Sequence, residues 1–188
     1  MKKGFTLLEL LIVIGILAIL STTMVLVINP AEMLKKARDS QRIADLSTLK
    51  TAIILYVTDV SNPNIGSDTY SFSMVSTQCA GRTASSTTSQ AVDGSGWIPI
   101  KFTDISGGSP ISNLPKDPNQ SAVGGDPSLY YVYLTNTADN TFELVANLES
   151  TSYSGTESED GGSINTLYEV GTKLGIVTTT SANCFPHP

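Results

Sequence analysis

KKGFTLLELLIVIGILAILSTTMVLVINP, residues 2–30, is the stretch that decides how this chain folds. Two lysines precede Gly4, and residues 10–28 form a run of nineteen residues without a charged side chain. At 1.5 Å per residue, a helix of that length spans roughly 28 Å, close to the hydrocarbon core of a bilayer. The flanking lysines favour a cytoplasmic N-terminus. We therefore predict a single-pass anchor in the cytoplasmic membrane, with the rest of the chain extracytoplasmic.

An ordinary secretory signal also has a short basic region followed by an apolar run, but it is cleaved after the run at a small-residue site. No convincing A-x-A pattern lies between Ala18 and Ala31. The small residue stands instead at Gly4, ahead of the apolar run. This order favours an anchor that is retained over a signal that is removed.

Residues 2–9 resemble the class III leader of type IV pilins and type II secretion pseudopilins, which has a basic leader, Gly, Phe, three residues and Glu. The resemblance implies that a prepilin peptidase cuts between Gly4 and Phe5 and methylates the new amine of Phe5. It also implies a structural subunit, not an enzyme, which assembles with copies of itself into a pilus or pseudopilus. An inner-membrane assembly platform and motor would be further partners.

Glu9 is the one acid at the start of the apolar segment. A carboxylate inside a membrane helix costs about 2.5–3.5 kcal/mol and needs a partner, yet no Lys or Arg lies in the segment. Cleavage before Phe5 would create an α-amine, and this cation could pair with Glu9 of a neighbouring subunit to direct assembly. The alternative is that Glu9 reaches the headgroups at the cytoplasmic edge.

The helical pattern continues beyond the membrane, and we predict one helix from Phe5 to Thr58. Its apolar stripe recurs every three or four residues: Ile43, Leu46, Leu49, Ile53 and Val57. Pro30 removes a backbone hydrogen bond and predicts a kink near Leu26 to Pro30. Gly15 is a second weak point. In the pilin family such residues weaken the helix, whereas in other membrane helices both residue types are simply tolerated.

Charged residues of both signs alternate just outside the membrane: Glu32, Lys35, Lys36, Arg38, Asp39, Arg42 and Asp45. One interpretation is a solvated helix face with i, i+4 pairing. The other is that these charges set the stagger between neighbouring helices of a filament. The sequence leaves both open.

After residue 58 the helical period ends, and a Ser/Thr-rich connector occupies residues 67–95. Strand-like runs follow at 97–102, 129–136 and 142–147, and weaker ones at 167–170 and 175–179; residues 137–141 predict a hairpin turn. A long helix against an antiparallel sheet is an α+β fold and resembles that of pilins. The predicted organisation is a leader at 1–4, a membrane and polymerisation helix at 5–29, an amphipathic helix at 30–58 and a β head at 59–188.

Two features of the head invite covalent or metal chemistry. Cys79 and Cys184 would lie in an oxidising compartment, where one disulfide between them would stabilise the head; two free thiols are the alternative. The acids Glu157, Glu159 and Asp160 lack the D-x-D-x-D-G spacing of a dedicated calcium loop, so we predict a solvated acidic loop with no metal or cofactor.

Charge and motif content exclude several functions. Residues 51–188 carry four basic side chains against thirteen acids, which provides no surface for direct nucleic-acid binding. The chain has one histidine, His187, and no G-x-S-x-G, P-loop or C-x-x-C motif, so we predict no enzymatic activity. The rival hypothesis is a membrane-tethered binding module or enzyme that does not polymerise.

Overall fold

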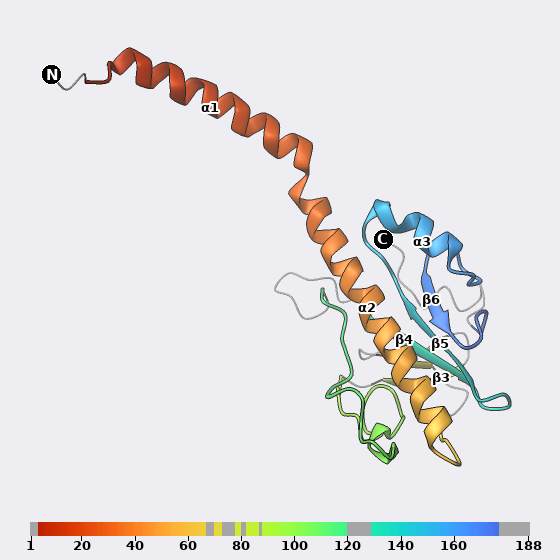
Figure 1. Cartoon of the computed structure of the whole chain (residues 1–188). Helices are drawn as coiled ribbons and strands as arrows, with labels where there is room; N and C mark the ends of the chain where they lie inside the picture. Colours follow the sequence, from red (N-terminus) through yellow and green to blue (C-terminus); the bar gives the residue numbers. More distant parts are fainter. Residues whose placement is uncertain are drawn as a thin grey trace.

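The computed structural model describes residues 4–66, 70–72, 78–79, 82–86, 88–119 and 129–176. A long helical rod leads from the N-terminus, and a head of strands and loops packs along its second half (Figure 1). This arrangement confirms the predicted α+β class and its pilin-like plan, a long N-terminal helix against an antiparallel sheet.

The rod consists of two helices, α1 at Leu7–Ile28 and α2 at Pro30–Asp59, rather than the single helix predicted. Asn29 separates them with φ 44° and ψ 75°, in the left-handed region. The residue before a proline is disfavoured in the α conformation, and Asn tolerates the left-handed one better than most residues. Pro30 then occupies the first turn of α2, where its missing N–H costs no hydrogen bond. Through Gly15 the helix runs without interruption.

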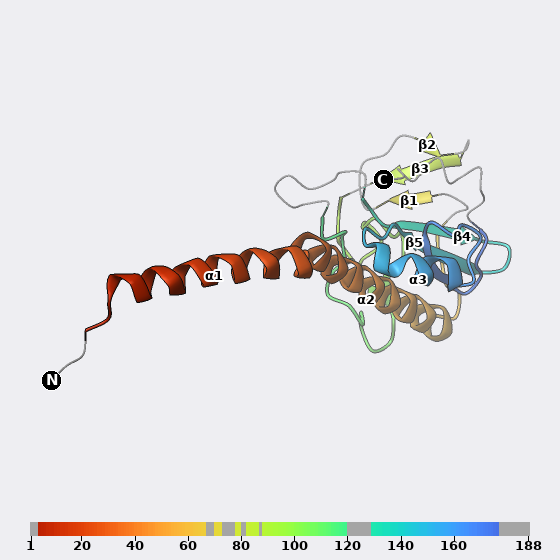
Figure 2. The ribbon, with the colours of Figure 1, turned by 90° about the horizontal axis from the view of Figure 1, so that it is seen from above.

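The sheet of the head has the strand order β2-β3-β1-β4-β5-β6 (Figure 2). Its strands are β1 (Tyr70–Phe72), β2 (Gln78–Cys79), β3 (Arg82–Ser86), β4 (Val132–Asn136), β5 (Thr141–Ala146) and β6 (Tyr168–Gly171). The predicted hairpin is present, because β4 and β5 pair antiparallel with Asn136 opposite Thr141. β5 and β6 are also antiparallel, whereas β1 and β3 pair in parallel.

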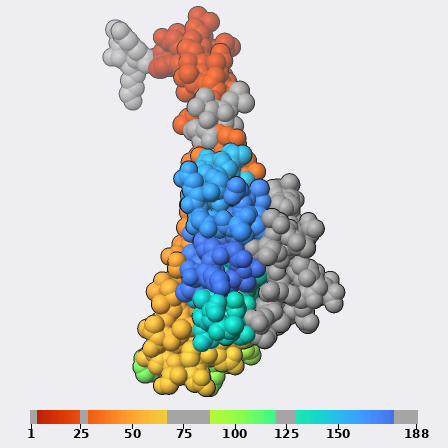
Figure 3. Space-filling view, turned by 90° about the vertical axis from the view of Figure 1, so that its right-hand side faces the viewer, coloured from red at the N-terminus to blue at the C-terminus, as the bar shows by residue number. Residues whose placement is uncertain are grey.

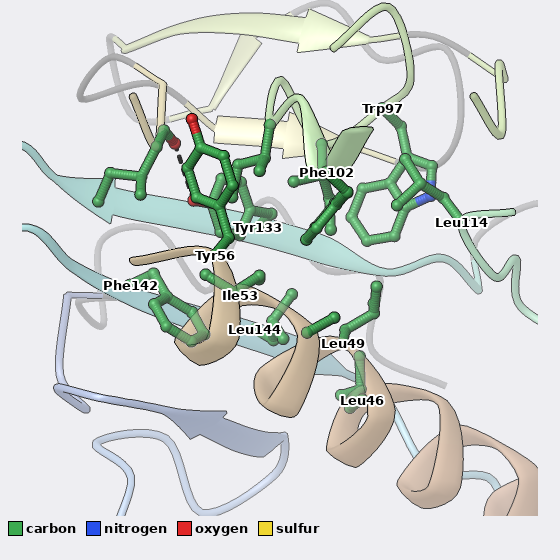
Figure 4. Close-up of a cluster of buried hydrophobic side chains, with 14 of the residues drawn as sticks. Leu46, Leu49, Ile53, Tyr56, Trp97, Phe102, Leu114, Tyr133, Phe142 and Leu144 are labelled. Carbon is green, nitrogen blue, oxygen red and sulfur yellow. Dashed lines mark hydrogen bonds between the residues drawn. The ribbon is translucent and has the colours of Figure 1, made fainter. Parts of the chain in front are cut away.

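The core lies between α2 and the sheet, where helix side chains meet aromatic and aliphatic residues of β4 and β5 (Figure 4). Leu46, Leu49 and Ile53 are fully buried, as the predicted stripe requires, while Ile43 and Val57 are half-buried at its margins. On the other flank of α2, a loop contributes Trp97 and Phe102, whose burial closes the core. The indole of Trp97 donates a hydrogen bond to the Pro115 carbonyl at 3.0 Å.

One strand prediction was wrong, one is tested only in part, and the connector is more ordered than predicted. Residues 97–102 form a loop that leads into the 3₁₀ helix η1 (Phe102–Asp104), because Pro99 within the run cannot donate to a ladder. The run is apolar because it is buried, not because it is a strand. Residues 175–176 are not in a strand, and 177–179 lie outside the described residues. β1, β2 and β3 all fall within the stretch predicted as a loop-rich connector.

α1 projects from the head as a separate rod (Figure 1), and in the space-filling view its atoms lie apart from those of the head (Figure 3). Its window Leu7–Met24 has a mean hydropathy of 2.4 and no buried residue. Among the described residues, this is the one helix long and apolar enough to cross a membrane. The helix therefore presents an apolar surface that the rest of the subunit does not cover, as membrane anchoring requires.

Candidate functional site

The predicted cleavage site lies in non-helical backbone immediately before α1. Residues 4–6 precede the first helical residue, Leu7, and the Phe5 side chain is 79% exposed. Apart from Gly4 and its two chain neighbours, no residue places a heavy atom within 4 Å of a Cβ built on Gly4. The Gly4–Phe5 peptide bond is thus open to approach from the surrounding solvent or from a membrane-embedded protease.

Glu9 and Thr6 form a reciprocal cap at the start of α1. The Glu9 carboxylate, through Oε2, accepts hydrogen bonds from the Thr6 backbone N–H at 2.9 Å and the Thr6 hydroxyl at 2.8 Å. The Thr6 Oγ1 in turn accepts a hydrogen bond from the Glu9 N–H at 3.2 Å. This is a capping box, which satisfies two backbone donors that a helix start would otherwise leave unpaired.

The capping box gives Glu9 a role that sequence reasoning missed, although the pattern Thr-x-x-Glu before an apolar run was visible. Both hydrogen bonds from Thr6 go to Oε2, so among the described residues Oε1 has no hydrogen-bond donor. The carboxylate can therefore hold its own helix start and still accept a bond from a second cation. The two roles are compatible in geometry.

Part of the charged run outside the membrane is buried against the head instead of facing solvent. Arg42 and Asp39, predicted on a solvated or intersubunit face, are both fully buried against the head. The Arg42 guanidinium donates two hydrogen bonds to Asp117, at 2.6 and 2.8 Å, and one each to Asp39 and Glu149 at 2.6 Å. Both interpretations of the run are therefore wrong for Arg42 and Asp39, whose partners lie within the same subunit.

Asp39 connects this ion cluster (Arg38, Asp39, Arg42, Asp117 and Glu149) to the chain after β5. Its carboxylate accepts hydrogen bonds from the backbone N–H groups of Glu149, at 3.0 Å, and Ser150, at 2.8 Å. Arg38 adds a second guanidinium on Glu149. Buried charges are tolerated where they are paired and fully hydrogen-bonded, and here nearly every polar atom has a partner. The cluster fixes the start of α2 to two separate loops of the head.

The ionisation of Glu149 is favoured by this environment. Burial opposes the charged form, but hydrogen bonds from Arg38 and Arg42 outweigh it and hold the pKa of Glu149 below its usual value. Burial also opposes the charged form of Arg42, yet the carboxylates, Asp117 first, keep its pKa above the ordinary value. Burial raises the pKa of Asp45, the partner of the Tyr131 hydroxyl.

The lowered pKa of Glu149 predicts acid sensitivity of the head. When the pKa of an acid is lower in the folded than in the unfolded protein, its ionisation stabilises the fold at pH values above the unfolded pKa, about 4.3 for Glu. This stabilisation is lost as the pH falls through the pKa of the folded protein. A Glu149→Gln variant should lower the free energy of unfolding at neutral pH by about 1.5–3 kcal/mol and flatten its decline below pH about 4. Denaturant unfolding at several pH values measures both effects. Equal pH profiles for variant and parent would contradict this assignment.

The remaining predicted residues are not brought together with the N-terminal site. The backbone of Cys79 lies in β2, but Cys184 is outside the described residues, so the disulfide stays a prediction. Glu157 accepts a hydrogen bond from the Leu148 N–H, and Asp160 accepts bonds from the N–H groups of Gly162 and Glu169. These two acids therefore accept backbone hydrogen bonds within the head.

Comparison with known proteins finds one family model that matches the N-terminus. Residues 1–25 match the prokaryotic N-terminal methylation motif, the class III signal of type IV pilins and pseudopilins. No curated protein and no solved structure matched the chain. The motif supports a type IV pilin-like precursor that prepilin peptidase processes, and it points to a structural subunit. It also implies filament assembly in general, and together with α1 it fits membrane anchoring.

Proposed function

We propose that this chain is a filament subunit that is cut between Gly4 and Phe5, methylated at Phe5 and polymerised through α1 into a pilus or pseudopilus. Residues 1–4 are the leader, 5–29 the polymerisation helix, 30–58 the helix of the head and 59–188 the head itself. Before assembly the chain crosses the cytoplasmic membrane once with its N-terminus cytoplasmic. An inner-membrane platform and motor would extract it; no contact with nucleic acid and no cofactor are proposed.

The observation that carries the proposal is the position of Glu9 relative to the scissile bond. Glu9 lies four residues after Phe5, at the start of a helix with no other charged residue. Its Oε1 is left without a donor among the described residues by the capping box. A new α-amine at Phe5 of an adjacent copy would neutralise this carboxylate in a low-dielectric surrounding, where such pairing is strongest.

The outward face of α2 supports continued packing beyond the membrane. The outward face of α2 consists of exposed, uncharged residues: Ala37, Ala44, Ser47, Thr48, Thr51, Ile54 and Leu55. The hydroxyls of Thr48 and Thr51 donate to carbonyls of their own helix at 2.8 and 2.9 Å. Ser21 and Thr22 do the same in α1. In Thr48 and Thr51, a hydroxyl bonded to the helix backbone leaves the methyl group free for contact, so the face suits close packing with another helix.

A charge placed on this face should block assembly without unfolding the head. We expect Ala44→Lys to reduce filament yield by about tenfold or more, because an unpaired charge buried at an interface costs several kcal/mol. Ala138→Lys, at the exposed turn between β4 and β5, is the matched control and should assemble normally. Electron microscopy of sheared filaments gives the yield. Normal filaments from Ala44→Lys would exclude this face from the subunit contacts.

A second candidate function is a tethered module that does not polymerise, and the capping box favours it. Thr6 already donates two hydrogen bonds to the Glu9 carboxylate, so the charged group has a partner within its own chain without a second subunit. The two candidates are separated by filament formation in the parent and in a Thr6→Ala variant, which removes the cap but keeps the charge. Polymerisation predicts that this variant still assembles, whereas the tether hypothesis predicts no filaments from either parent or variant.

A further inference from the structure

The start of α2 combines exposed apolar and basic side chains directly outside the membrane. The Met33 and Leu34 side chains are 56% and 62% exposed, although both are large and apolar. Lys36 is exposed and Lys35 is half-buried, and neither forms an ion pair with a described residue. We refer to residues 33–36 as the basic collar.

The acids nearest the collar are hydrogen-bonded to the head and form no ion pair with its lysines, although the charge of Glu32 still acts on Lys35 one turn away. Glu32 accepts a hydrogen bond from the Ser150 hydroxyl, and Asp39 is buried beside Arg42. The head as a whole is acidic, so the collar differs in sign from most of the subunit surface. The first turns of α2 also lie nearer to α1 than the acidic helix α3 (Ser154–Glu159) does (Figure 1).

The position of the collar along the chain brings it to the lipid headgroups. If the apolar run ends at Ile28, Lys35 and Lys36 lie roughly 10–12 Å farther along the helix path, just outside a headgroup layer of about 5–7 Å. Long lysine side chains reach back to phosphates from such a position, while apolar neighbours enter the interface. The chain must cross this layer wherever α1 is inserted.

We propose that the basic collar binds the phosphate groups of anionic phospholipids in the leaflet from which the chain emerges, and that it holds the inserted subunit there until extraction. The proposal rests on the membrane topology of the proposed function. It adds a partner, an anionic lipid surface, that the assembly hypothesis does not require. Extraction into a filament would break these contacts, so the collar opposes premature release.

The test uses the full-length chain inserted singly into nanodiscs of phosphatidylcholine, or of phosphatidylcholine mixed with phosphatidylglycerol. The rate of amine acylation is measured at each lysine by mass spectrometry. Lys101 and Lys173, which are half-exposed on the head and paired with Asp104 and Asp139, are internal controls. We expect about fivefold slower acylation of Lys35 and Lys36 in the anionic discs, the factor equivalent to ~1 kcal/mol per lysine near an anionic surface. High salt should abolish the difference.

Each contrary outcome is distinct. Equal rates for Lys35 and Lys36 in the two kinds of disc would overturn the collar while leaving anchoring and assembly intact. Protection that arises only when two copies share a disc would assign the lysines to a second subunit and overturn the lipid assignment. A chain retained by neither kind of disc would refute the anchoring itself, and with it both proposals. Lys36→Gln should leave the acylation of Lys101 unchanged in both discs.

Discussion

Glu9→Gln is expected to be inserted into the membrane and cleaved like the parent but to yield at least about tenfold fewer filaments. Glutamine at this position can still complete the capping box with Thr6, so the start of α1 is preserved. What the variant loses is the negative charge that would pair with the Phe5 amine of the next subunit. A loss of about 1.4 kcal/mol per contact already corresponds to tenfold, and every subunit of a filament would lose it.

The matched control is Thr6→Ala, which removes the cap while keeping the charge. It should form filaments in near-parental amounts, because helix capping contributes only about 1 kcal/mol and α1 is held by the surrounding bilayer or helices. Filament yield is compared by quantitative immunoblotting of sheared fractions, with membrane fractions as the measure of insertion. If Thr6→Ala fails to assemble while Glu9→Gln succeeds, the cap and not the charge is the functional feature.

Arg42→Met should produce the largest loss of stability from a single substitution in the head. The side chain is fully buried and donates hydrogen bonds to three carboxylates, of Asp39, Asp117 and Glu149. Removing it leaves buried negative charge without its principal partner, which typically costs 3–5 kcal/mol. Thermal or denaturant unfolding of the full chain in detergent, followed by the fluorescence of the buried Trp97, measures the change.

Lys36→Met is the control, because it makes the same chemical change on the same helix at an exposed position. It should alter the free energy of unfolding by less than about 0.5 kcal/mol. Comparable stability of the two variants would mean that the ion cluster does not hold α2 to the head.

The apolar stripe of α2 shows how far the sequence could predict the fold. Its spacing correctly placed Leu46 and Leu49 against the sheet. The same spacing, continued toward the N-terminus, passes through Arg42 and Asp39, so the buried face includes two charged residues. Periodicity places residues on a face, but whether a charge on that face is solvated depends on partners distant in sequence, here Asp117 and Glu149. A pattern within one helix cannot reveal those.

The local sequence predicted the helix break at Asn29 correctly and the conformation of residues 97–102 wrongly. Pro30 led us to expect a distortion near the membrane boundary, and the helix does end at Ile28, because the restriction that proline places on its predecessor is local. The apolar run around Trp97 read as a strand, yet its residues are buried in a loop. Burial alone makes a segment apolar, so hydrophobicity does not determine its conformation.

The roles of the candidate site residues stay predictions, and the local geometry around them was not predicted from the sequence. Gly4, Phe5 and Glu9 follow from the motif, which matched residues 1–25. The capping box depends on the side-chain conformations of Thr6 and Glu9, which the cost of a carboxylate in a membrane does not specify.

Cleavage and methylation at Phe5 are the steps on which the account depends most directly. Intact-mass measurement and N-terminal sequencing of the chain extracted from its native membrane test both steps. We expect a polypeptide that begins at Phe5 and carries one added methyl group on its amine. A mature chain that retains residues 1–4, or begins at any other residue, would contradict it.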